Sequence, residues 1–312
     1  MTDPEHKRIL LVEDNPGDAR LMVEILADAG ADQDELEHVD RISAAIKRLS
    51  EQKFDIVLLD LSLPDGSGLE TVARICTADP QMPVIVLTGL EDDNLALAAV
   101  QAGAQDYLVK GQVDGPGITR SIRYAIQRKG LEERLQYQAT HDPLTGLPNR
   151  RLFQDRMAHA VERARRNLMG SDMKWEMAVV LLDLDDFKSV NDTLGHAQGD
   201  LLLQAVAERL QKTIRKADTL ARMGGDEFTL ILENLTGAED VKHLAKKIKA
   251  AFADPFQIGD QLLEITASIG ICLYPFDGGQ AESLLKYADI AMYIAKRNRN
   301  QVCFYSDCKD EL

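Results

Sequence analysis

The stretch ARMGGDEFTLIL, residues 221–232, reads as a β-hairpin whose turn holds two glycines followed by two acids. Gly224 and Gly225 suit a tight turn that needs positive φ angles. Asp226 and Glu227 then stand at the hairpin tip, although acids are poor strand formers. Glycine beside acids is also ordinary turn chemistry, so this stretch alone leaves a solvated turn and a ligand site open.

A second acidic segment, VVLLDLDDF at residues 179–187, ends another apolar strand pattern. Asp183 closes that strand and would face the hairpin if the two strands are neighbours. Two carboxylates from adjacent strands can bind hard divalent cations, as in the two-metal sites that catalyse nucleotidyl transfer. Lys188 follows closely and supplies a compact cation for phosphate charge.

An amide and a carboxylate come next along the chain. Asn191 and Asp200 flank a turn-like stretch that contains Gly195 and Gly199. A carboxylate accepts from guanine N1–H and the exocyclic amine, and an amide bonds the acceptor edge, so the pair favours GTP over ATP. Lys296 is a candidate triphosphate clamp, although an exposed helix lysine is the simpler interpretation when it is taken alone.

These motifs belong to a C-terminal domain, residues 141–308, whose strands pair as hairpins with helices between them. This order predicts the α+β class. The predicted helices cover 150–167, 199–216, 238–253 and 281–297, and the predicted strands cover 176–187, the hairpin 218–232, 256–265 and 266–275.

In the N-terminal domain, residues 6–128, short apolar strand patterns alternate with amphipathic helical patterns. This alternation predicts a doubly wound α/β fold with a parallel sheet covered by helices on both faces. The predicted strands are 8–14, 36–40, 54–60, 83–89 and 105–111, and the helices between and after them are 19–30, 42–52, 69–79, 94–103 and 117–129.

Polar residues end the strands of this domain. Glu13 and Asp14, Asp60, Thr88 and Lys110 close the first, third, fourth and fifth strands. Ligands of open parallel sheets bind at the carboxyl ends of the strands. Several carboxylates in one crevice repel unless a cation lies between them, so the pattern predicts an octahedral Mg²⁺ site beside an ammonium group.

The segment 118–140 joins the two domains and stays helical while becoming highly charged. Ile122, Ile126, Leu131 and Leu135 form a thin apolar stripe. Two interpretations remain open, a solvated connector and a signalling helix that pairs with its copy in a dimer.

The bulk composition limits the partners. A chain of 312 residues suggests two domains, and a formal net charge of −15 argues against a general nucleic-acid or membrane-surface binder. The four cysteines lack ligand-like spacing, and neither a membrane span nor a signal peptide is predicted. We therefore expect a cytoplasmic protein in which the terminal KDEL is coincidental.

The strand-end residues of the N-terminal domain resemble those of response-regulator receiver domains. The resemblance implies a flavodoxin-like strand order 2-1-3-4-5 and phosphorylation of Asp60 by a cognate histidine kinase. The implied site residues are Glu13, Asp14 and Asp60 for Mg²⁺ and Thr88, Tyr107 and Lys110 for the phosphorylation switch. One departure is Gly111, which stands where many receivers have proline.

The C-terminal domain resembles the GGDEF-type diguanylate cyclases, on the motifs DPLTGLPNRR, DLDDFKSVNDTLGHAQGD, ARMGGDEF, ASIGICLYP and ADIAMYIAK. The resemblance implies a palm-like sheet and a reaction that joins two GTP into cyclic di-GMP with release of pyrophosphate. Each domain would hold one GTP, so the enzyme would act as a homodimer.

The same resemblance implies roles for individual residues. The Mg²⁺ ligands, with Mn²⁺ as an alternative ion, would be Asp183, the carbonyl of Leu184, Asp226 and Glu227. Asp226 would also accept the proton of the ribose 3′-hydroxyl, and Lys188 would stabilise phosphate charge. The implied substrate-binding residues are Asn191, Asp200, Asp186, Phe187, Lys188, Lys296 and Arg299.

Arg215 and Asp218 match the RxxD site at which cyclic di-GMP inhibits this family, and arginine suits bidentate phosphate or guanine contacts. The chain departs from the family after Lys296, where AKRNRNQ lacks a glycine and leaves the register of Arg299 uncertain.

Three functions compete: a phosphorylation-controlled diguanylate cyclase, a non-catalytic receptor for GTP or cyclic di-GMP, and a receiver-driven adaptor. The full set of catalytic-type residues favours the first. No phosphodiesterase domain is recognised, so we expect synthesis only.

Overall fold

The computed structural model describes residues 6–29, 35–89, 93–168, 177–235 and 237–308. The chain divides into two compact units, one ending at Gln136 and the other beginning at Tyr137, and each is described by itself. The terminal KDEL, Gly30 of the first predicted helix and Glu176 of a predicted strand lie outside the described residues.

The N-terminal unit is a doubly wound α/β fold, in which a five-stranded sheet has the order β2-β1-β3-β6-β7 with every neighbouring pair parallel. Counting only these five strands, the predicted order 2-1-3-4-5 is confirmed. The elements are β1 (Arg8–Val12), α1 (Pro16–Asp28), β2 (Glu35–Val39), α2 (Ile42–Glu51), β3 (Ile56–Asp60), β4 (Ser62–Leu63), β5 (Gly66–Ser67), α3 (Leu69–Ala78), β6 (Val84–Thr88), α4 (Asp93–Gln101), β7 (Asp106–Val109) and α5 (Gly115–Thr140).

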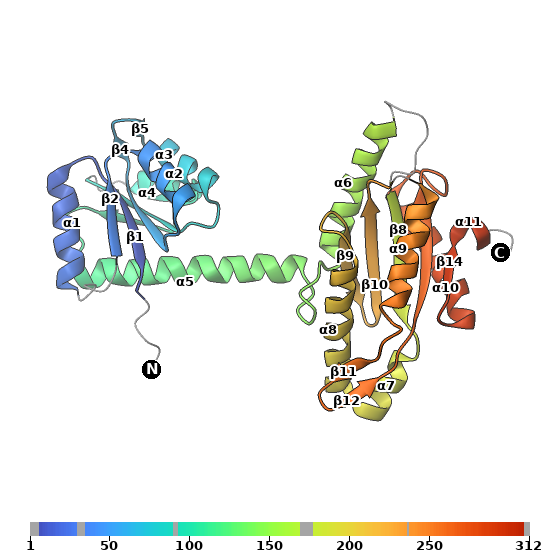
Figure 1. Cartoon of the computed structure of the whole chain (residues 1–312). Coiled ribbons are helices and arrows are strands. Elements are labelled where there is room, and N and C mark those ends of the chain that lie inside the picture. The colour runs from blue at the N-terminus through green and yellow to red at the C-terminus, as the bar shows by residue number, and fades with distance from the viewer. Residues whose placement is uncertain (1–5, 30–34, 90–92, 169–176, 236, 309–312) are drawn as a thin grey trace. The chain divides into compact units, whose positions relative to one another are not determined.

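Side chains along each central strand alternate between two cores, because successive residues of a strand point to opposite faces. In β1, Leu10 packs on the side of α2 and α3, whereas Ile9 and Leu11 pack on the side of α1 and α5. Figure 1 shows these two helical layers on either side of the sheet. Both faces are buried, which explains the continuous apolar runs of these strands.

The helix α5 runs without a break from Gly115 to Thr140 and passes through Gly130. Its first part is buried at Ile118, Ile122 and Ala125, while Leu131 and Leu135 are 58% and 65% exposed. Of the predicted apolar stripe, Ile122 is buried and Ile126 is half-buried against the N-terminal core, so only Leu131 and Leu135 are exposed.

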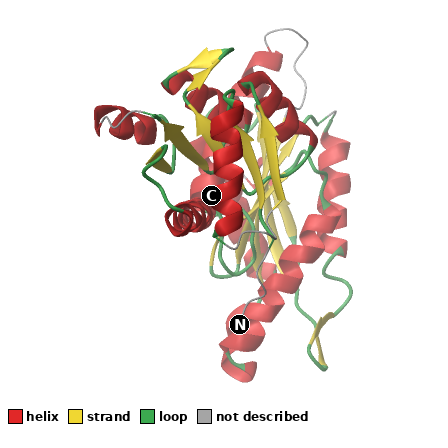
Figure 2. Cartoon of the chain, turned by 90° about the vertical axis from the view of Figure 1, so that its left-hand side faces the viewer, coloured by secondary structure: helices red, strands yellow, loops and turns green. Residues whose placement is uncertain are grey.

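The C-terminal unit is an α+β fold built on a mixed five-stranded sheet of order β14-β13-β8-β10-β9. Its elements, coloured by type in Figure 2, are α6 (Arg150–Leu168), β8 (Met177–Leu184), α7 (Phe187–Leu194), α8 (His196–Thr213), β9 (Thr219–Gly224), β10 (Glu227–Glu233), α9 (Ala238–Ala250), β11 (Phe256–Ile258), β12 (Gln261–Leu263), β13 (Ala267–Tyr274), α10 (Ala281–Asn298), β14 (Val302–Phe304) and α11 (Tyr305–Cys308).

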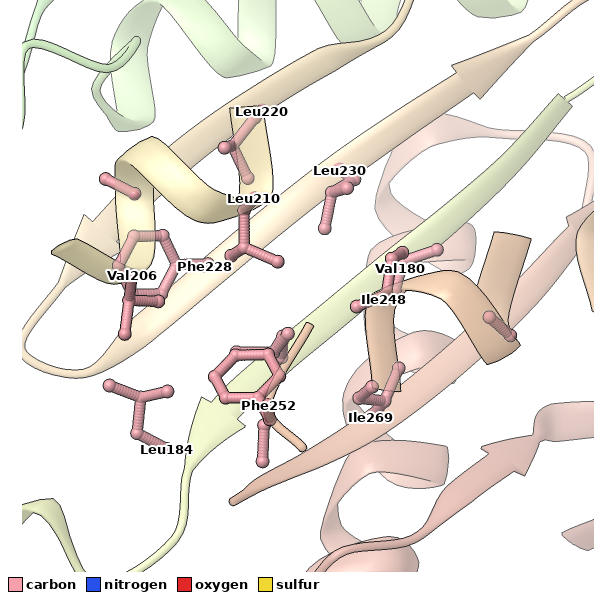
Figure 3. Packing of buried hydrophobic residues seen from close by; sticks show 14 of the residues in the cluster. Val180, Leu184, Val206, Leu210, Leu220, Phe228, Leu230, Ile248, Phe252 and Ile269 are labelled. Atoms are coloured by element: carbon pink, nitrogen blue, oxygen red, sulfur yellow. The ribbon is translucent and has the colours of Figure 1, made fainter. Parts of the chain in front are cut away.

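The two faces of this sheet are covered by different helices. Val180 of β8 belongs to the core that it shares with α8 and α9, as Figure 3 shows with Leu210 and Ile248. Val179, one residue earlier, belongs to the opposite core with α6 and α10. Strand parity therefore decides which helix each residue of β8 meets, and it places Asp183 on the side of α10.

Two predicted elements differ from the structure. The predicted strand 256–265 is a small hairpin, β11 and β12, which turns at Gly259 with φ of 58° and forms a separate two-stranded sheet. The stretch between Asn191 and Asp200, which was expected to be turn-like, is mostly helical. Helix α7 ends before Gly195 and α8 begins after it, and Gly195 makes the turn with φ of 85°. Within the described part of the chain, no helix is long and apolar enough to cross a membrane.

Candidate functional sites

At the carboxyl end of the N-terminal sheet, Lys110 lies among three acids. Its Nζ lies 2.5 Å from Glu13, 2.6 Å from Asp60 and 3.0 Å from Asp18. Ligand oxygens of Glu13, Asp14 and Asp60 all lie within 4.8 Å of one another, the only such group of three among the described residues. Oxygen donors at this spacing suit a hard cation such as Mg²⁺.

The electrostatics of this cluster are those of a crowded anionic pocket. Burial raises the pKa of the Glu13 carboxyl, Lys110 lowers it in part, and the neighbouring Asp60 raises it again. Burial alone would lower the pKa of Lys110, but its bonds to Asp60, Glu13 and Asp18 outweigh that cost and raise the pKa above its ordinary value. The acids thus hold the lysine charged, and they still have oxygens to offer a cation.

The other predicted switch residues lie on the adjoining strands. Thr88 ends β6 and is buried, and its carbonyl accepts from the Lys110 N–H at 2.7 Å. Tyr107 lies on β7 and packs, half-buried, against the core below α2 and α3. Gly111 has φ of 80°, which proline cannot adopt, so glycine here gives the loop a path that a proline would forbid.

In the C-terminal unit, the register of β8 and β10 brings the acids together. Glu227 lies directly opposite Asp183, so both side chains point to the α10 face of the sheet. Asp226 lies in the turn before β10, and its carbonyl accepts from the Leu184 N–H at 3.4 Å. Gly224 and Gly225 have φ of 135° and 56°, as the sequence predicts for this tight turn.

Lys296 of α10 reaches this acidic group. Its Nζ lies 2.8 Å from both carboxylate oxygens of Asp183, but only Oδ2 meets hydrogen-bond geometry. Oδ1 of Asp183 is buried and accepts no hydrogen bond. The charged group closest to Oδ1 is the Lys296 ammonium at 2.8 Å. The carboxylate oxygens of Asp183, Asp226 and Glu227 do not all lie within 4.8 Å of one another, so a shared divalent cation would draw these side chains closer together.

Charge shifts at this site follow from its burial. Burial raises the pKa of Asp183, Lys296 opposes this, and Asp226 and Glu227 raise it further. The pKa of Lys296 is raised, because Asp183, Asp226 and Asp185 outweigh the effect of its own partial burial. A cavity of about 350 Å³ opens beside these groups, lined by Asp183, Glu227 and Lys296.

The predicted guanine-binding pair lies on α7 and α8. Asn191 is half-buried on α7, and its Oδ1 is buried without a hydrogen-bond partner. Asp200 is exposed near the start of α8. Gly199 is buried between the two helices, and a Cβ on it would lie 1.9 Å from Oδ1 and 3.0 Å from Cγ of Asn191. The glycine therefore leaves the room that the Asn191 side chain occupies.

The predicted guanine-binding role of Asn191 implies that Gly199→Ala weakens nucleotide binding, because the added methyl group forces Asn191 or the helix pair to move. For GTP as the predicted substrate, we expect KM to rise about tenfold, equivalent to about 1.4 kcal/mol, with a smaller change in kcat. Steady-state kinetics measure the split. Gly279→Ala is the matched control, since its Cβ meets nothing within 4 Å; an unchanged KM in Gly199→Ala would contradict the assigned role of Asn191.

Three further predicted substrate residues lie between the end of β8 and the first turn of α7. Asp186 is exposed, has φ of 56° and forms an ion pair with Arg299. Phe187 is buried in the core, so only its backbone can meet a ligand. Lys188 is exposed on the first turn of α7. The first N–H groups of a helix lack intrahelical partners and favour anions.

The RxxD pair forms the turn that precedes β9. The Arg215 N–H donates to Asp218 Oδ2 at 3.0 Å, and the Asp218 N–H donates to the Arg215 carbonyl at 3.0 Å. The Arg215 side chain is exposed. This turn and Asp226 lie at opposite ends of β9, about 20 Å apart along a strand of this length.

Arg222 was not singled out by the sequence, yet it joins two motifs. Its Nη1 donates to both oxygens of Asp142 at 2.9 and 3.1 Å, and its Nε and Nη2 donate to the Gly225 carbonyl at 3.0 and 2.7 Å. One side chain thus ties the entry turn after α5 to the turn that precedes Asp226. Its place beside the two glycines was the only available signal.

Two acids were also missed. Asp18 of α1 contacts Lys110, and Asp185, next to the predicted loop residues, is buried with three hydrogen-bond donors around its carboxylate. Neither has a distinctive sequence pattern, because their partners lie far along the chain.

Comparison with known proteins agrees with this geometry. A profile described as "Diguanylate cyclase, GGDEF domain" matches residues 139–301, and one described as "Response regulator receiver domain" matches residues 9–122. The chain therefore belongs to the GGDEF family, and a receiver domain precedes its GGDEF domain.

Three individual proteins illustrate the likeness. The bifunctional diguanylate cyclase/cyclic di-GMP phosphodiesterase MucR of Pseudomonas aeruginosa is 48% identical over 54% of this chain, which spans 24% of that protein. The response regulator PleD of Caulobacter vibrioides is 30% identical over 95% of this chain, which spans 65% of PleD. The coiled coil and GGDEF domain of DgcB from Caulobacter crescentus, solved in complex with c-di-GMP, matches with a TM-score of 0.51 and 27% identity, covering 60% of this chain and 96% of that one.

Proposed function

We propose that the protein is a diguanylate cyclase that condenses two GTP into cyclic di-GMP and releases two pyrophosphates. The observation that carries this proposal is the pairing of Asp183 with Glu227 in register, beside Asp226 in its tight turn and Lys296 on α10. MucR, a bifunctional diguanylate cyclase/cyclic di-GMP phosphodiesterase, and PleD, a response regulator matched over 95% of this chain, support it.

The acidic group would hold Mg²⁺, or Mn²⁺, through Asp183, the Leu184 carbonyl, Asp226 and Glu227. Such an ion supplies Lewis-acid polarisation of the phosphate and neutralises developing charge. Asp226 would accept the proton of the attacking ribose 3′-hydroxyl. Lys188 would meet the charge that grows on the phosphates during displacement.

Binding of GTP would divide between two regions of the domain. Asn191 and Asp200 would hydrogen-bond the guanine edge, and the buried free acceptor of Asn191 supports a ligand there. Lys296, Arg299 and the loop of Asp186, Phe187 and Lys188 would hold the triphosphate. In the ligand-free chain Lys296 and Arg299 are paired with Asp183 and Asp186, so the phosphates would have to exchange for these carboxylates.

Regulation would begin at Asp60, with a histidine kinase as the phosphate source. Glu13, Asp14 and Asp60 would hold Mg²⁺, and Lys110 would turn from the carboxylates to the phosphoryl group. Phosphorylation adds charge and acceptor oxygens, which would draw Thr88 inward and repack the face around Tyr107.

The output would be a homodimer in which two GTP face each other. The exposed Leu131 and Leu135 of α5 support its pairing with a second copy. Arg222 would carry a movement of the entry turn to the turn that precedes Asp226. Since the proposed substrate, GTP, is a cytoplasmic nucleotide, the proposal places the protein in the cytoplasm.

The test is direct. Purified full-length protein is incubated with GTP and Mg²⁺, with and without beryllofluoride as a phosphoryl mimic, and cyclic di-GMP is measured by chromatography. We expect product in both states and more with beryllofluoride. Absence of product both with and without beryllofluoride would contradict the proposal. Retained GTP binding would then identify a non-catalytic GTP receptor.

Product inhibition would act at Arg215 and Asp218. Arg215→Ala removes the guanidinium but keeps the backbone bond to Asp218, so the turn should persist. We expect the inhibition constant for cyclic di-GMP to rise at least about tenfold, the size of a lost charge-assisted contact. Rates measured against added cyclic di-GMP give this constant, and Lys216→Ala, an exposed neighbouring cation, should leave it unchanged. Unaltered inhibition in Arg215→Ala would show that the product binds elsewhere.

A further inference from the structure

Asp185 is the most completely bonded acid of the C-terminal unit's acidic loop. It is 6% exposed, its Oδ1 accepts from the Ser268 hydroxyl at 2.7 Å, and its Oδ2 accepts from the Thr266 hydroxyl at 2.5 Å. Oδ2 also accepts from the backbone N–H of Asn300 at 2.9 Å. Its own N–H donates to the Thr266 carbonyl at 2.9 Å. Both oxygens of this carboxylate are thus engaged by donors of the protein itself.

The segment that Asp185 holds is conformationally unfavourable. Arg299 and Asn300 have φ of 51° and 47°, although neither is glycine, and Arg299 combines its φ with ψ of 160°. L-residues seldom adopt such angles, and they persist only where surrounding contacts impose them. The contacts that impose them here include the Asn300–Asp185 bond and the ion pair of Arg299 with Asp186.

Asp185 therefore joins two loops that come from distant parts of the chain. One follows β8 and carries Asp186 and Lys188, and the other follows α10 and carries Arg299. The Gln301 carbonyl, directly after this second loop, accepts from Ile269 of β13 at 2.9 Å, so the loop is fastened on both sides of Asn300.

We propose that Asp185 is a positioning residue that fixes Arg299 for the triphosphate of GTP, an inference that rests on the proposed function of this domain. It acts through the backbone of Asn300 and does not touch the nucleotide. The recognised group is the β- and γ-phosphate end of a nucleoside triphosphate, whereas the guanine end is held on α7 and α8.

An electrostatic role and a positioning role of Asp185 predict opposite effects of its substitution on nucleotide binding. The negative charge of Asp185 lies near Lys296 and would repel phosphate, so a purely electrostatic role predicts tighter nucleotide binding when the charge is removed. A positioning role predicts weaker binding, because an amide replaces the charge-assisted bond to the Asn300 N–H with a weaker neutral one.

The experiment compares binding of 3′-deoxy-GTP, which lacks the attacking hydroxyl, with binding of GMP to the full-length protein in Mg²⁺ by calorimetry. For Asp185→Asn we expect at least about tenfold weaker 3′-deoxy-GTP binding and less than about twofold change for GMP, as for one displaced charge-assisted contact. In the Arg299→Ala background, Asp185→Asn should weaken 3′-deoxy-GTP binding by less than about a further twofold, because the effects of coupled residues are not additive.

The other outcomes are decisive. Tighter or unchanged 3′-deoxy-GTP binding, an equal loss for both nucleotides, or additivity with Arg299→Ala would overturn the positioning role while leaving the cyclase proposal standing. Failure of the unmutated protein to bind 3′-deoxy-GTP would overturn both.

Two further variants complete the design. Ser268→Ala removes the donor to Oδ1 but keeps the Asn300 bond, so it should preserve the preference for the triphosphate. If Asp185→Asn does not fold, Asp185→Glu retains the charge but shifts the carboxylate by one methylene away from the Asn300 N–H, and a loss confined to 3′-deoxy-GTP is again expected. An equal loss for GMP in Asp185→Glu would contradict the positioning role.

Discussion

Asp226→Ala is expected to reduce the formation of cyclic di-GMP by at least about a thousandfold, because it removes a residue that we propose both to bind the cation and to accept the 3′-hydroxyl proton. A thousandfold loss corresponds to about 4 kcal/mol of transition-state stabilisation, within the several kcal/mol that a bound metal supplies. Chromatography of the product after incubation with GTP and Mg²⁺ measures the loss.

The fold should survive this substitution. Asp226 is half-buried in a turn whose shape depends on Gly224 and Gly225, and its carbonyl, which accepts from Leu184, is retained. Asp260→Ala is the matched control, since Asp260 is also a turn acid that follows a glycine and lies exposed in the β11–β12 hairpin. An active Asp226→Ala variant would show that the catalytic acids lie elsewhere.

Asp60→Asn is expected to abolish stimulation by phosphorylation or by beryllofluoride. For the unmutated protein we expect a stimulation within the 5- to 150-fold range of typical allosteric couplings. With beryllofluoride, the variant should stay within about twofold of its basal rate. The amide is isosteric but cannot accept the phosphoryl group, and Lys110 keeps its bonds to Glu13 and Asp18. Rates with and without beryllofluoride measure the effect.

Asp18→Asn controls for the loss of a charge beside Lys110. Asp18 lies 3.0 Å from the lysine but stands outside the group of Glu13, Asp14 and Asp60. It should therefore keep the response to beryllofluoride. Full stimulation of Asp60→Asn would place the phosphorylation site on another residue.

Much of the fold was predictable because local patterns encode it. Alternating apolar runs and helical periods predicted the parallel sheet, and strand parity explains why Ile9 and Leu10 enter different cores. The hairpin at Gly224 was predictable for the same reason, since positive φ is a local requirement. The strand assigned to 256–265 was wrong because its apolar content is shared by two strands too short to show a period.

The candidate sites were predictable only as lists of residues. The chemistry of Asp183, Asp226 and Lys296 can be read from their residue types, but the distances that pair Lys296 with Asp183 cannot. Helix α7 was not predicted because it is short and polar and the residues on either side of it are typical of loops. Arg222 and Asp185 were missed because their function consists of bonds to residues 80 and 115 positions away.

By itself the sequence determined the two fold classes, the turn at the two glycines and the residue types that can hold cations, guanine and phosphate. Only the tertiary structure decided that Glu227 faces Asp183, that Gly199 makes room for Asn191 and that Asp185 fastens the loop of Arg299. The physical reason is range: backbone preference and hydrophobic period act over a few residues, whereas these contacts exist only after strands and helices from distant segments have packed.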